Sequence, residues 1–383
     1  MKHAIDVIPG WAIHPISFRP FDGFWSMNPS IHYDGERWRC AMRNVDYHTP
    51  HGVVLANMKR GGKVTTRNVM ATLDPRTWQP IELAEMLEED GNLKNLSVSS
   101  LGYEDLRLFR TEREGLLAIC TTMQLRGDPK QEMAILRFED AAAGRYNIVS
   151  ATPIRGAWGE VPQKNWSPFD GALDVRLLYS IEGGILFDER GPLDPARPIT
   201  LGGVSRDAAR TTEAPAVPPE PRTPAQALPG RGGDPHRAYN GGIETKHTPR
   251  VQAIARAGET GTPITRARGP SWTQTGLRGG SQLIALQPDV WLGIGHEMQW
   301  RHNRKNYWHV WFTCDNRGQL LERSEPMKLS TCGIEFAAGL ALDDERTELV
   351  LSFGTEDQDS WIATMPLEAV LATLRPVAHT GAA

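Results

Sequence analysis

The sequence predicts an all-β fold, a five-bladed β-propeller formed by one domain over residues 1–383. The main observation is a recurring unit: a short polar cluster, a strand, a turn rich in Asp, Gly and Glu, and a second strand. Its five copies begin near residues 28, 105, 165, 280 and 338. Intervals of about 60–77 residues fit four-stranded blades with their loops. A β-sandwich is the alternative, but it does not explain a polar cluster at the head of every unit.

Each copy contains two stretches with strand character joined by a turn signal. The copies are residues 28–44, 104–122, 165–180, 279–297 and 336–354. In the first copy the pair Asp34-Gly35 is typical of a hairpin turn. Helix is scarce: residues 80–90 could form a short one, and residues 366–374 place apolar residues at helical spacing after Pro366. The second segment predicts a C-terminal helix packed on the sheets.

One interval, of about 115 residues, is too long for a blade. It contains a Pro/Gly/Arg-rich insertion, residues 203–268, with seven prolines between Thr211 and Pro235. Such a composition cannot bury enough apolar surface to offset chain entropy, so the insertion is predicted to be disordered and dispensable for folding. A surface loop without function is favoured over a lid or a segment that binds a partner.

Composition excludes several function classes. The net charge of −4 gives no basic excess for a nucleic-acid or membrane partner. The four cysteines form no CxxC pair, which argues against a zinc ribbon and for buried thiols in a reducing compartment. The pair of histidines in residues 48–51 is better explained as a loop than as a metal site. We therefore expect no metal and no cofactor, no signal peptide or membrane helix, and a cytoplasmic location. No oligomeric state is predicted.

In a propeller, polar residues at the heads of the blades converge on the central channel. The residues expected there combine carboxylates, cations and amides: Asn28, Arg43, Glu104, Asp105, Arg107, Lys164, Asn165, Ser180, Glu182, Arg278, Ser281, His296, Glu297, Glu356 and Asp357. This mixture suits a polyhydroxylated ligand, with Trp25 or Trp166 able to cover an apolar sugar face. A carboxylic acid among other acids can have a raised pKa and act as a general acid.

These head motifs resemble glycoside hydrolase family 130, a family of five-bladed propellers that includes mannoside phosphorylases, hydrolases and mannosyltransferases. The matching segments cover most of the chain except the insertion and occur in the family's order: Asn28-Pro29 with Arg43, residues 103–107, Lys164-Asn165 with Pro168-Phe169, residues 278–281, residues 291–296 and residues 353–357. Residues 103–107 resemble the family's Tyr-Glu-Asp-Pro-Arg motif, whose Asp is the catalytic acid. The resemblance implies that Asp105 is the acid, acting through a sugar hydroxyl.

The chain departs from the family at three places. Leu106 replaces a proline, Ser281-Gln282 replaces Thr-Pro, and the strand over residues 177–182 lacks an arginine that helps to bind phosphate. The missing cation favours attack by water, with Glu182 or Glu297 as base, or transfer to an acceptor sugar, without strict need for phosphate. The alternatives are a phosphate-dependent phosphorylase that uses Lys164, Arg278 and His296, and a non-catalytic propeller that binds a glycan or a protein.

The resemblance and the head positions together give the candidate site. The predicted catalytic residues are Asp105, Glu182 and Glu297. The predicted substrate-binding residues are Asn28, Arg43, Glu104, Arg107, Lys164, Asn165, Arg278, Ser281, His296 and Asp357. Adjacent strand residues point to opposite faces, so Glu104 is expected to diverge from Asp105 unless it also binds the sugar, and Arg107 to share the face of Asp105. The plainer explanation of Glu104-Asp105 is a solvated turn before a strand.

Overall fold

The computed structural model describes residues 2–48, 55–56, 63–88, 98–125, 130–141, 145–154, 164–193, 276–301, 304–330 and 333–377. These residues form mainly antiparallel sheets, and the helices among them are α1 (Ala4–Val7) and α3 (Leu367–Leu371). None of the described helices is long and apolar enough to cross a bilayer. The predicted all-β fold class is confirmed.

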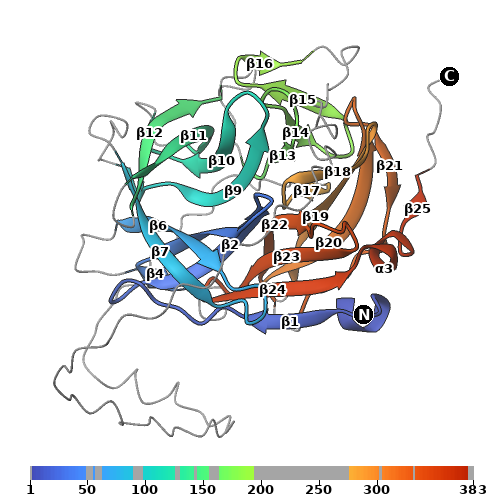
Figure 1. The fold of residues 1–383 in the computed structure, drawn as a ribbon, viewed down its shortest axis with the longest axis horizontal. Helices are drawn as coiled ribbons and strands as arrows, with labels where there is room; N and C mark the ends of the chain where they lie inside the picture. Colours follow the sequence, from blue (N-terminus) through green and yellow to red (C-terminus); the bar gives the residue numbers. More distant parts are fainter. Residues whose placement is uncertain are drawn as a thin grey trace, which may run out of the picture. The chain divides into compact units, whose positions relative to one another are not determined.

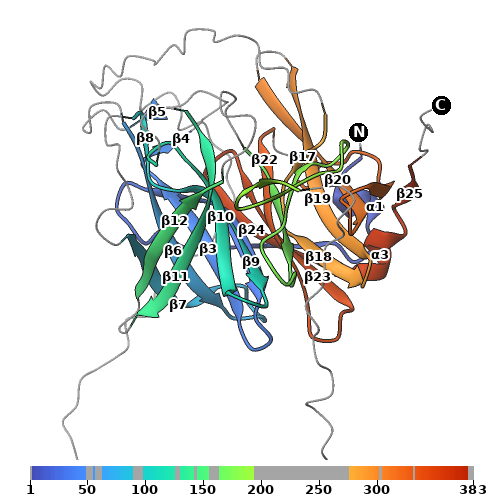
Figure 2. The same cartoon turned by 90° about the horizontal axis from the view of Figure 1, so that it is seen from above.

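Blades one and two share one sheet (Figure 1). Blade one runs outward through β2 (Trp25–Tyr33), β3 (Trp38–Val45), β6 (Val64–Leu73) and β7 (Pro80–Glu88). Blade two runs through β9 (Glu104–Thr111), β10 (Gly115–Thr122), β11 (Glu132–Ala141) and β12 (Arg145–Pro153). The outer strands β7 and β12 pair in parallel and join the two blades. Short strands β4 (Tyr47–His48), β5 (Leu55–Ala56) and β8 (Ser100–Leu101) lie toward one end of these blades (Figure 2).

Blades three and four share a second sheet, joined by parallel pairing of their inner strands β13 and β18. Blade three consists of β13 (Ser167–Asp170), β14 (Leu177–Ser180), β15 (Ile185–Asp188) and β16 (Gly191–Pro192). Blade four consists of β18 (Leu283–Gln287), β19 (Val290–Arg301), β20 (Arg304–Asp315) and β21 (Leu320–Arg323), with β17 (Arg278–Gly279) on β19 and β25 (Arg375–Pro376) on β21.

Blade five joins the two ends of the described chain in one sheet. Its strands are β22 (Glu335–Leu342), β23 (Glu348–Thr355), β24 (Asp359–Pro366) and β1 (Ala12–Pro15). The N-terminal strand β1 pairs antiparallel with β24, from Ala12 opposite Thr364 to Pro15 opposite Trp361. Sequence patterns did not indicate this outer strand, because β1 lies more than 300 residues from its partner.

The five inner strands contact one another in a closed ring. β2 contacts β9, β9 contacts β13, β13 contacts β18, β18 contacts β22, and β22 returns to β2 (Figure 1). The buried side-chain amide of Gln282 links three of these strands. Its Nε2 donates to the carbonyls of Ile31 (2.8 Å) and Leu340 (2.6 Å). Its Oε1 accepts from the Leu340 amide at 3.1 Å. One side chain thus ties blades four, five and one, and the arrangement is the predicted five-bladed propeller.

Apolar side chains fill the space between neighbouring sheets. Trp291 and Phe312 are fully buried beside Phe169 of blade three, and Leu108 is fully buried in the core of blade two. Trp166, expected beside the cavity as a sugar-stacking residue, is instead 1% exposed and packs on Phe187 at 4.6 Å between ring centres. The indole therefore belongs to the core.

Two of the secondary-structure predictions are tested by the described residues. α3 confirms the C-terminal helix, although it is shorter than residues 366–374. The short helix over residues 80–90 is wrong, because residues 80–88 form strand β7, where pairing with β6 and β12 outweighs helix propensity. The predicted disordered insertion at residues 203–268 lies outside the described residues.

Candidate functional site

Three residues from the heads of blades one, two and three share an uncommon backbone conformation. Asn28, Asp105 and Asn165 have φ angles of 47°, 53° and 63°. Asn and Asp tolerate this left-handed region better than most residues, and such conformations cost about 1–3 kcal/mol each. Pairing also shifts register by one residue next to Asn28 and Asp105, as expected for β-bulges. Bulges re-aim side chains, and these three turn toward a shared polar centre.

Asp105 is the middle of this centre and is 8% exposed. Its Oδ1 accepts hydrogen bonds from Arg43 Nη1 at 2.7 Å and from Asn28 Nδ2 at 2.8 Å. Both partners come from blade one and are 5% exposed. The side chains predicted from blades one and two are therefore in direct contact.

Glu104 lies on the same side as Asp105. Its Oε2 is 3.6 Å from Arg43 Nη2 and 3.4 Å from Lys164 Nζ, and its Oε1 accepts from the Ser100 hydroxyl at 2.6 Å. Glu104 does not diverge from Asp105, because the bulge breaks the alternation of the strand. The alternative expectation, that Glu104 binds a sugar hydroxyl, stays a prediction. The solvated-turn explanation also fails, since Glu104 is 7% exposed.

Burial would raise the pKa values of both acids, but neighbouring cations reverse the effect. For Asp105, Arg43 and Lys164 together with the Asn28 hydrogen bond hold the pKa well below its usual range. For Glu104, Lys164 and Arg43 outweigh burial and lower the pKa. The pair therefore carries two negative charges at neutral pH, balanced by the cations around it.

Arg107 is fully buried and links three blades. Its Nε donates to the Gly280 carbonyl, its Nη2 donates to Asn165 Oδ1 at 3.0 Å, and its Nη1 donates to the Asp105 carbonyl at 3.4 Å. Its guanidinium also lies 5.2 Å from the ring centre of Phe336. These contacts make Arg107 a support of the backbone at Asp105 and Gly280 and of the Asn165 side chain.

On the blade-four side, Arg278 and His296 are cross-strand partners. His296 is fully buried among aromatic rings, 5.2 Å from Tyr307 and 5.5 Å from Phe336 between centres. Burial, together with His309 and Arg278, holds the pKa of His296 well below its usual range, so the ring is neutral. Neither of its ring nitrogens has a hydrogen-bond partner among the described residues.

Asp357, in the turn between β23 and β24, acts electrostatically on two tyrosines of the same centre. It has a φ of 55° and raises the pKa values of Tyr47 and Tyr307, as Asp105 also does. Burial is the main cause for both tyrosines, and the pKa of Tyr307 rises to about 12. Both acids therefore lie near the same two tyrosines, as expected for blade heads that converge.

Tyr47 and Tyr307 were missed by sequence reasoning. The hydroxyl of Tyr47 accepts from Arg43 Nη2 at 3.4 Å. Tyr307 lies in a stretch that alternates like any buried strand, and it shares a face with His309, the cross-strand partner of His296. The strand register that places Tyr307 beside His296 could have identified it, but only if the pairing of β19 with β20 had been known.

Three predicted residues have their polar contacts elsewhere. The hydroxyl of Ser281 donates to the Gln282 carbonyl at 2.7 Å and accepts from the Ile294 amide at 3.3 Å. Glu182 and Glu297 both lie near Arg323, at 3.8 and 3.3 Å. Both acids therefore contact Arg323 rather than the carboxyl group of Asp105.

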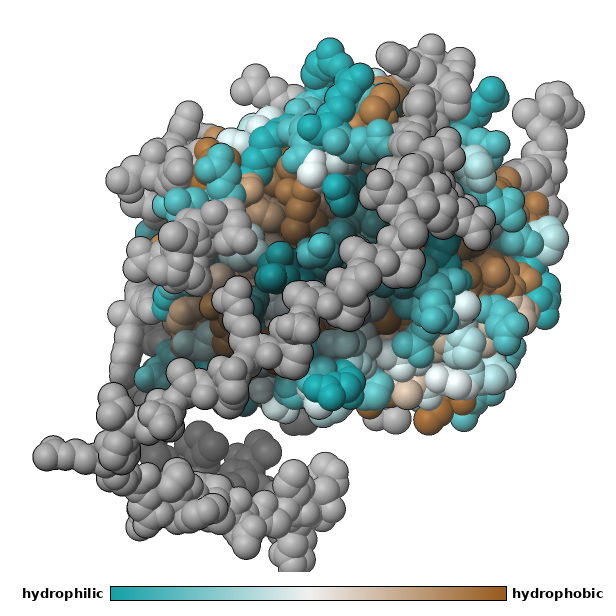
Figure 3. Space-filling view, viewed as in Figure 1, coloured by the Kyte–Doolittle hydropathy of each residue, from teal (hydrophilic) through white to brown (hydrophobic). Residues whose placement is uncertain are grey.

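Hydrophilic residues occupy the middle of the face shown in Figure 3, next to apolar patches. Within the described ranges, no group of three or more His, Cys, Asp or Glu side chains is arranged to hold a metal ion. What the centre offers a ligand is therefore carboxylate and amide oxygens, cationic N–H donors and phenol groups. Such groups bind sugar hydroxyls.

No family model and no curated protein matches the sequence. The comparison with solved structures gives several similar chains. A β-1,2-mannobiose phosphorylase from Listeria innocua, in complex with β-1,2-mannobiose, has 10% sequence identity and a TM-score of 0.49, with 94% of this chain and 96% of that chain covered. A glycosyl hydrolase from Bacteroides ovatus has 13% identity and a TM-score of 0.46, covering 98% and 94%. A mannose phosphorylase from Leishmania mexicana, in complex with phosphate, has 11% identity and a TM-score of 0.44, covering 96% and 91%.

Proposed function

We propose that the protein is a carbohydrate-active enzyme that cleaves or transfers a mannoside-like glycosyl unit at the Asp105 centre. The observation that carries the proposal is the buried contact of Asp105 with Arg43 and Asn28, flanked by Glu104 and Lys164. An exposed acid without a function would not need buried partners that hold its carboxylate in one orientation. The left-handed backbone at Asp105 adds strain of the kind found at functional sites.

The proposed roles combine the family resemblance with the positions of the side chains. Asp105 is the proton donor to the scissile oxygen, acting through a sugar hydroxyl. The groups proposed to contact the sugar are Asn28, Arg43, Glu104, Lys164, Asn165, Arg278, His296 and Asp357, with Tyr47 and Tyr307 added by the structure. Arg107 and Ser281 act by holding the backbone around them. Glu182 or Glu297 remains the proposed base, which requires one of them to reach the water that attacks the scissile bond.

The low pKa of Asp105 affects its proposed role as proton donor. The Asp105 carboxylate is ionised while Arg43 and Asn28 bind it, so it must take up a proton before it can donate one. A sugar oxygen that draws the donors of Arg43 or Asn28 away from Asp105 would raise the pKa of the acid. Substrate binding would then prepare the acid as well as place the sugar.

Phosphate is proposed not to be strictly required. Phosphate binding needs several cationic donors that converge on one place. Arg43 and Lys164 are paired with the two acids, and Arg107 donates to Gly280, Asn165 and Asp105. An incoming phosphate would have to displace these contacts, whereas water or an acceptor hydroxyl would not.

The same low pKa favours a second candidate, a propeller that binds a glycan without turning it over. An acid that stays ionised can accept hydrogen bonds from sugar hydroxyls but cannot protonate a leaving group. Both candidates use the same side chains, so an assay of turnover separates them.

The test uses the full chain with β-linked manno-oligosaccharides as substrates, with and without inorganic phosphate. Release of reducing sugar, or transfer to added mannose, should occur at similar rates in both conditions. Turnover only with phosphate would establish the phosphorylase alternative. Saturable binding without turnover in either condition would establish the non-catalytic candidate.

A further inference from the structure

The chain reaches Asp105 through a short segment that lies against blade one. Residues 100–103, here called the entry segment, come directly before β9 of blade two. Their first part is strand β8, which pairs in parallel with Val64 and Thr65 of β6 in blade one. Because the entry segment leads into Glu104 and Asp105, its position also sets the positions of these two acids.

The backbone at Asp105 needs support on both sides. Its φ of 53° lies in the left-handed region, and a residue keeps such a conformation only where the surrounding structure holds the chain in place. After Asp105 this support comes from Arg107, whose Nη1 donates to the Asp105 carbonyl at 3.4 Å. Before Asp105 the support has to come from the entry segment.

Gly102 of the entry segment is fixed through both of its backbone polar groups. Its amide donates to Gln124 Oε1, and its carbonyl accepts from Thr122 Oγ1 at 3.2 Å. Both partners are buried in blade two. Gly102 also has a φ of +93°, and a Cβ there would collide with the Thr66 carbonyl oxygen of blade one. The backbone at Gly102 therefore has little room to shift.

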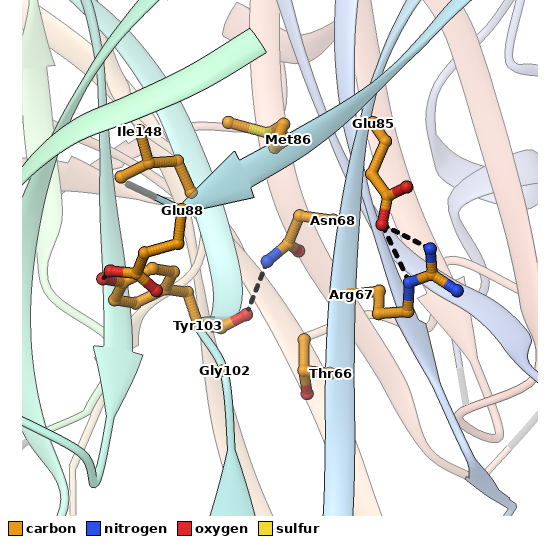
Figure 4. A pocket seen from close by; sticks show the side chains of 9 residues that line it. All are labelled: Thr66, Arg67, Asn68, Glu85, Met86, Glu88, Gly102, Tyr103 and Ile148. Carbon is orange, nitrogen blue, oxygen red and sulfur yellow. Dashed lines mark hydrogen bonds and ion pairs between the residues drawn. The ribbon is translucent and has the colours of Figure 1, made fainter. Parts of the chain in front are cut away.

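Tyr103, the last residue of the entry segment, is held at both ends. Its carbonyl accepts from Asn68 Nδ2 at 3.0 Å, and its hydroxyl donates to Glu88 Oε1. These residues line a small pocket between blades one and two, with the Arg67–Glu85 pair on its opposite side (Figure 4). The ring is 3% exposed, so the hydroxyl and the backbone of Tyr103 are both fixed to blade one.

Stability alone does not explain the bond between Tyr103 and Glu88. Burial raises the pKa of Glu88, which means that the folded protein disfavours the charged form of this side chain. An apolar residue packed against a phenylalanine would avoid that cost. A hydroxyl bonded to one acceptor, in contrast, fixes the ring at one place along the surface of blade one.

We propose that Glu88 and Tyr103 are positioning residues for the Asp105 centre, because their hydrogen bond fixes the backbone that leads into Glu104 and Asp105. The proposal rests on the proposed function, since it concerns turnover at that centre. Among the described residues the Tyr103 hydroxyl is bonded to Glu88 and not to either of the acids that follow it. Both positioning residues therefore act through the backbone and not on the sugar.

The main test compares two Tyr→Phe variants of the full chain on the β-linked manno-oligosaccharide that is turned over fastest. Tyr103→Phe removes the hydroxyl and keeps the ring. Its kcat should fall about three- to thirtyfold, less than the roughly 100-fold that a misplacement of about 1 Å can cost. Its KM should stay within about twofold of the wild-type value, because the groups that contact the sugar are unchanged.

Tyr146→Phe is the matched control. Tyr146 is buried in the same core as Tyr103, and its hydroxyl accepts from Arg39 Nη1 at 2.7 Å. Tyr146→Phe should lower the melting temperature as much as Tyr103→Phe does, but it should keep the wild-type kcat. An unchanged kcat in Tyr103→Phe, or an equal fall in both variants, would overturn the proposal.

Variants of Glu88 test the acceptor. Glu88→Gln keeps an oxygen that can accept from the Tyr103 hydroxyl, and it should retain most of the kcat at neutral pH. Glu88→Leu removes the acceptor and should lower kcat as much as Tyr103→Phe does. Because both residues act through one bond, the double variant Tyr103→Phe/Glu88→Leu should be no slower than the slower single variant. Additive losses would contradict the proposal.

A measurement without substrate separates this proposal from the proposed function. The Nε–H signal of Arg43 in ¹⁵N-labelled ligand-free protein, assigned with Arg43→Lys, reports on Asp105, which accepts a hydrogen bond from Arg43. Tyr103→Phe should shift this signal and Tyr146→Phe should not, while the signal of exposed Arg113 stays in place in both. A shift in a protein that turns over no substrate would refute the proposed function alone. An unmoved Arg43 signal in Tyr103→Phe would refute the positioning role, whatever the turnover.

Discussion

Two carboxyl groups on either side of Tyr103 have opposite protonation behaviour. Glu88 bonds to the Tyr103 hydroxyl, and Asp105 follows Tyr103 by two residues. Burial raises the pKa of Glu88 to about 7, only partly offset by the Tyr103 hydrogen bond, whereas the pKa of Asp105 is held well below its usual range. Asp105 is the more buried of the two, so burial alone would give the reverse order.

The difference lies in the cations nearby. Arg43 and Lys164 lower the pKa of Asp105, whereas Arg67, on the opposite side of the pocket from Glu88 (Figure 4), is paired with Glu85. A buried acid with cations around it therefore stays ionised, and a buried acid without nearby cations is protonated more easily. Removing single groups from each region tests this account.

The largest effect is expected from Asp105→Asn. The amide keeps the shape and an oxygen for Arg43, but it cannot transfer the proton. Turnover should fall about 10²–10⁴-fold, the usual worth of a general acid, with ligand binding and folding kept. The measurement is initial rate on a confirmed substrate. Asp174→Asn, which changes an aspartate paired with exposed Arg113, is the control and should keep full activity. Near-normal activity of Asp105→Asn would move the acid role to Glu182 or Glu297.

Arg43→Met tests the cations directly. It leaves Asp105 buried without its closest positive charge, and breaking such a pair costs about 3–5 kcal/mol of unfolding free energy. The loss should be smaller in acid, because the raised pKa lets Asp105 protonate. Urea unfolding at neutral and acid pH measures both quantities. Arg113→Met, at an exposed pair, should cost no more than about 1 kcal/mol. Equal losses at the two arginines would contradict the account.

Leu108→Ala tests how much the core of blade two beneath Asp105 contributes to stability. Leu108 is fully buried on β9, three residues after Asp105, and packs with the core of blade two. Its truncation should lower the free energy of unfolding by about 2–5 kcal/mol. Ile81→Ala, at a residue that is 65% exposed, should change stability by no more than about 0.5 kcal/mol. Denaturant unfolding of both variants is the measurement.

The smallest effect is expected at Glu88. The folded protein holds the Glu88 proton to a pH of about 7, whereas the unfolded chain releases it near 4.5. The folded state thus binds more protons across this window, and the Glu88 contribution to stability falls as pH rises from about 4.5 to about 7. Glu88→Gln should remove that decline. Melting temperatures of wild type and variant, compared across the window, would run parallel if Glu88 has an ordinary pKa.

The blade heads could be predicted from the sequence because they repeat. Asn28, Asp105 and Asn165 were found as polar residues before strands, and the structure brings their side chains into one hydrogen-bonded centre with Arg43 and Arg107. The left-handed backbone could not be found in this way, since it depends on a bulge in the pairing. Glu104 was therefore expected on the wrong face.

Longer-range features were missed for the same physical reason. β7 has residues that favour a helix, and only its pairing with β6 and β12 makes it a strand. Trp166 follows Asn165 directly, yet strand geometry turns it into the core. Tyr307 joins the site through the register of β19 and β20, which short sequence patterns do not encode.

The strand β1 has a consequence for how the chain is made. During synthesis β1 leaves the ribosome long before its partner β24, which follows it by more than 300 residues. Until then the N-terminal segment has no sheet to join, and bringing the two together closes a loop of nearly the whole chain. Blade five therefore cannot be completed until β24 has been made. A substitution in β1 is expected to act on a late step of folding rather than on an early one.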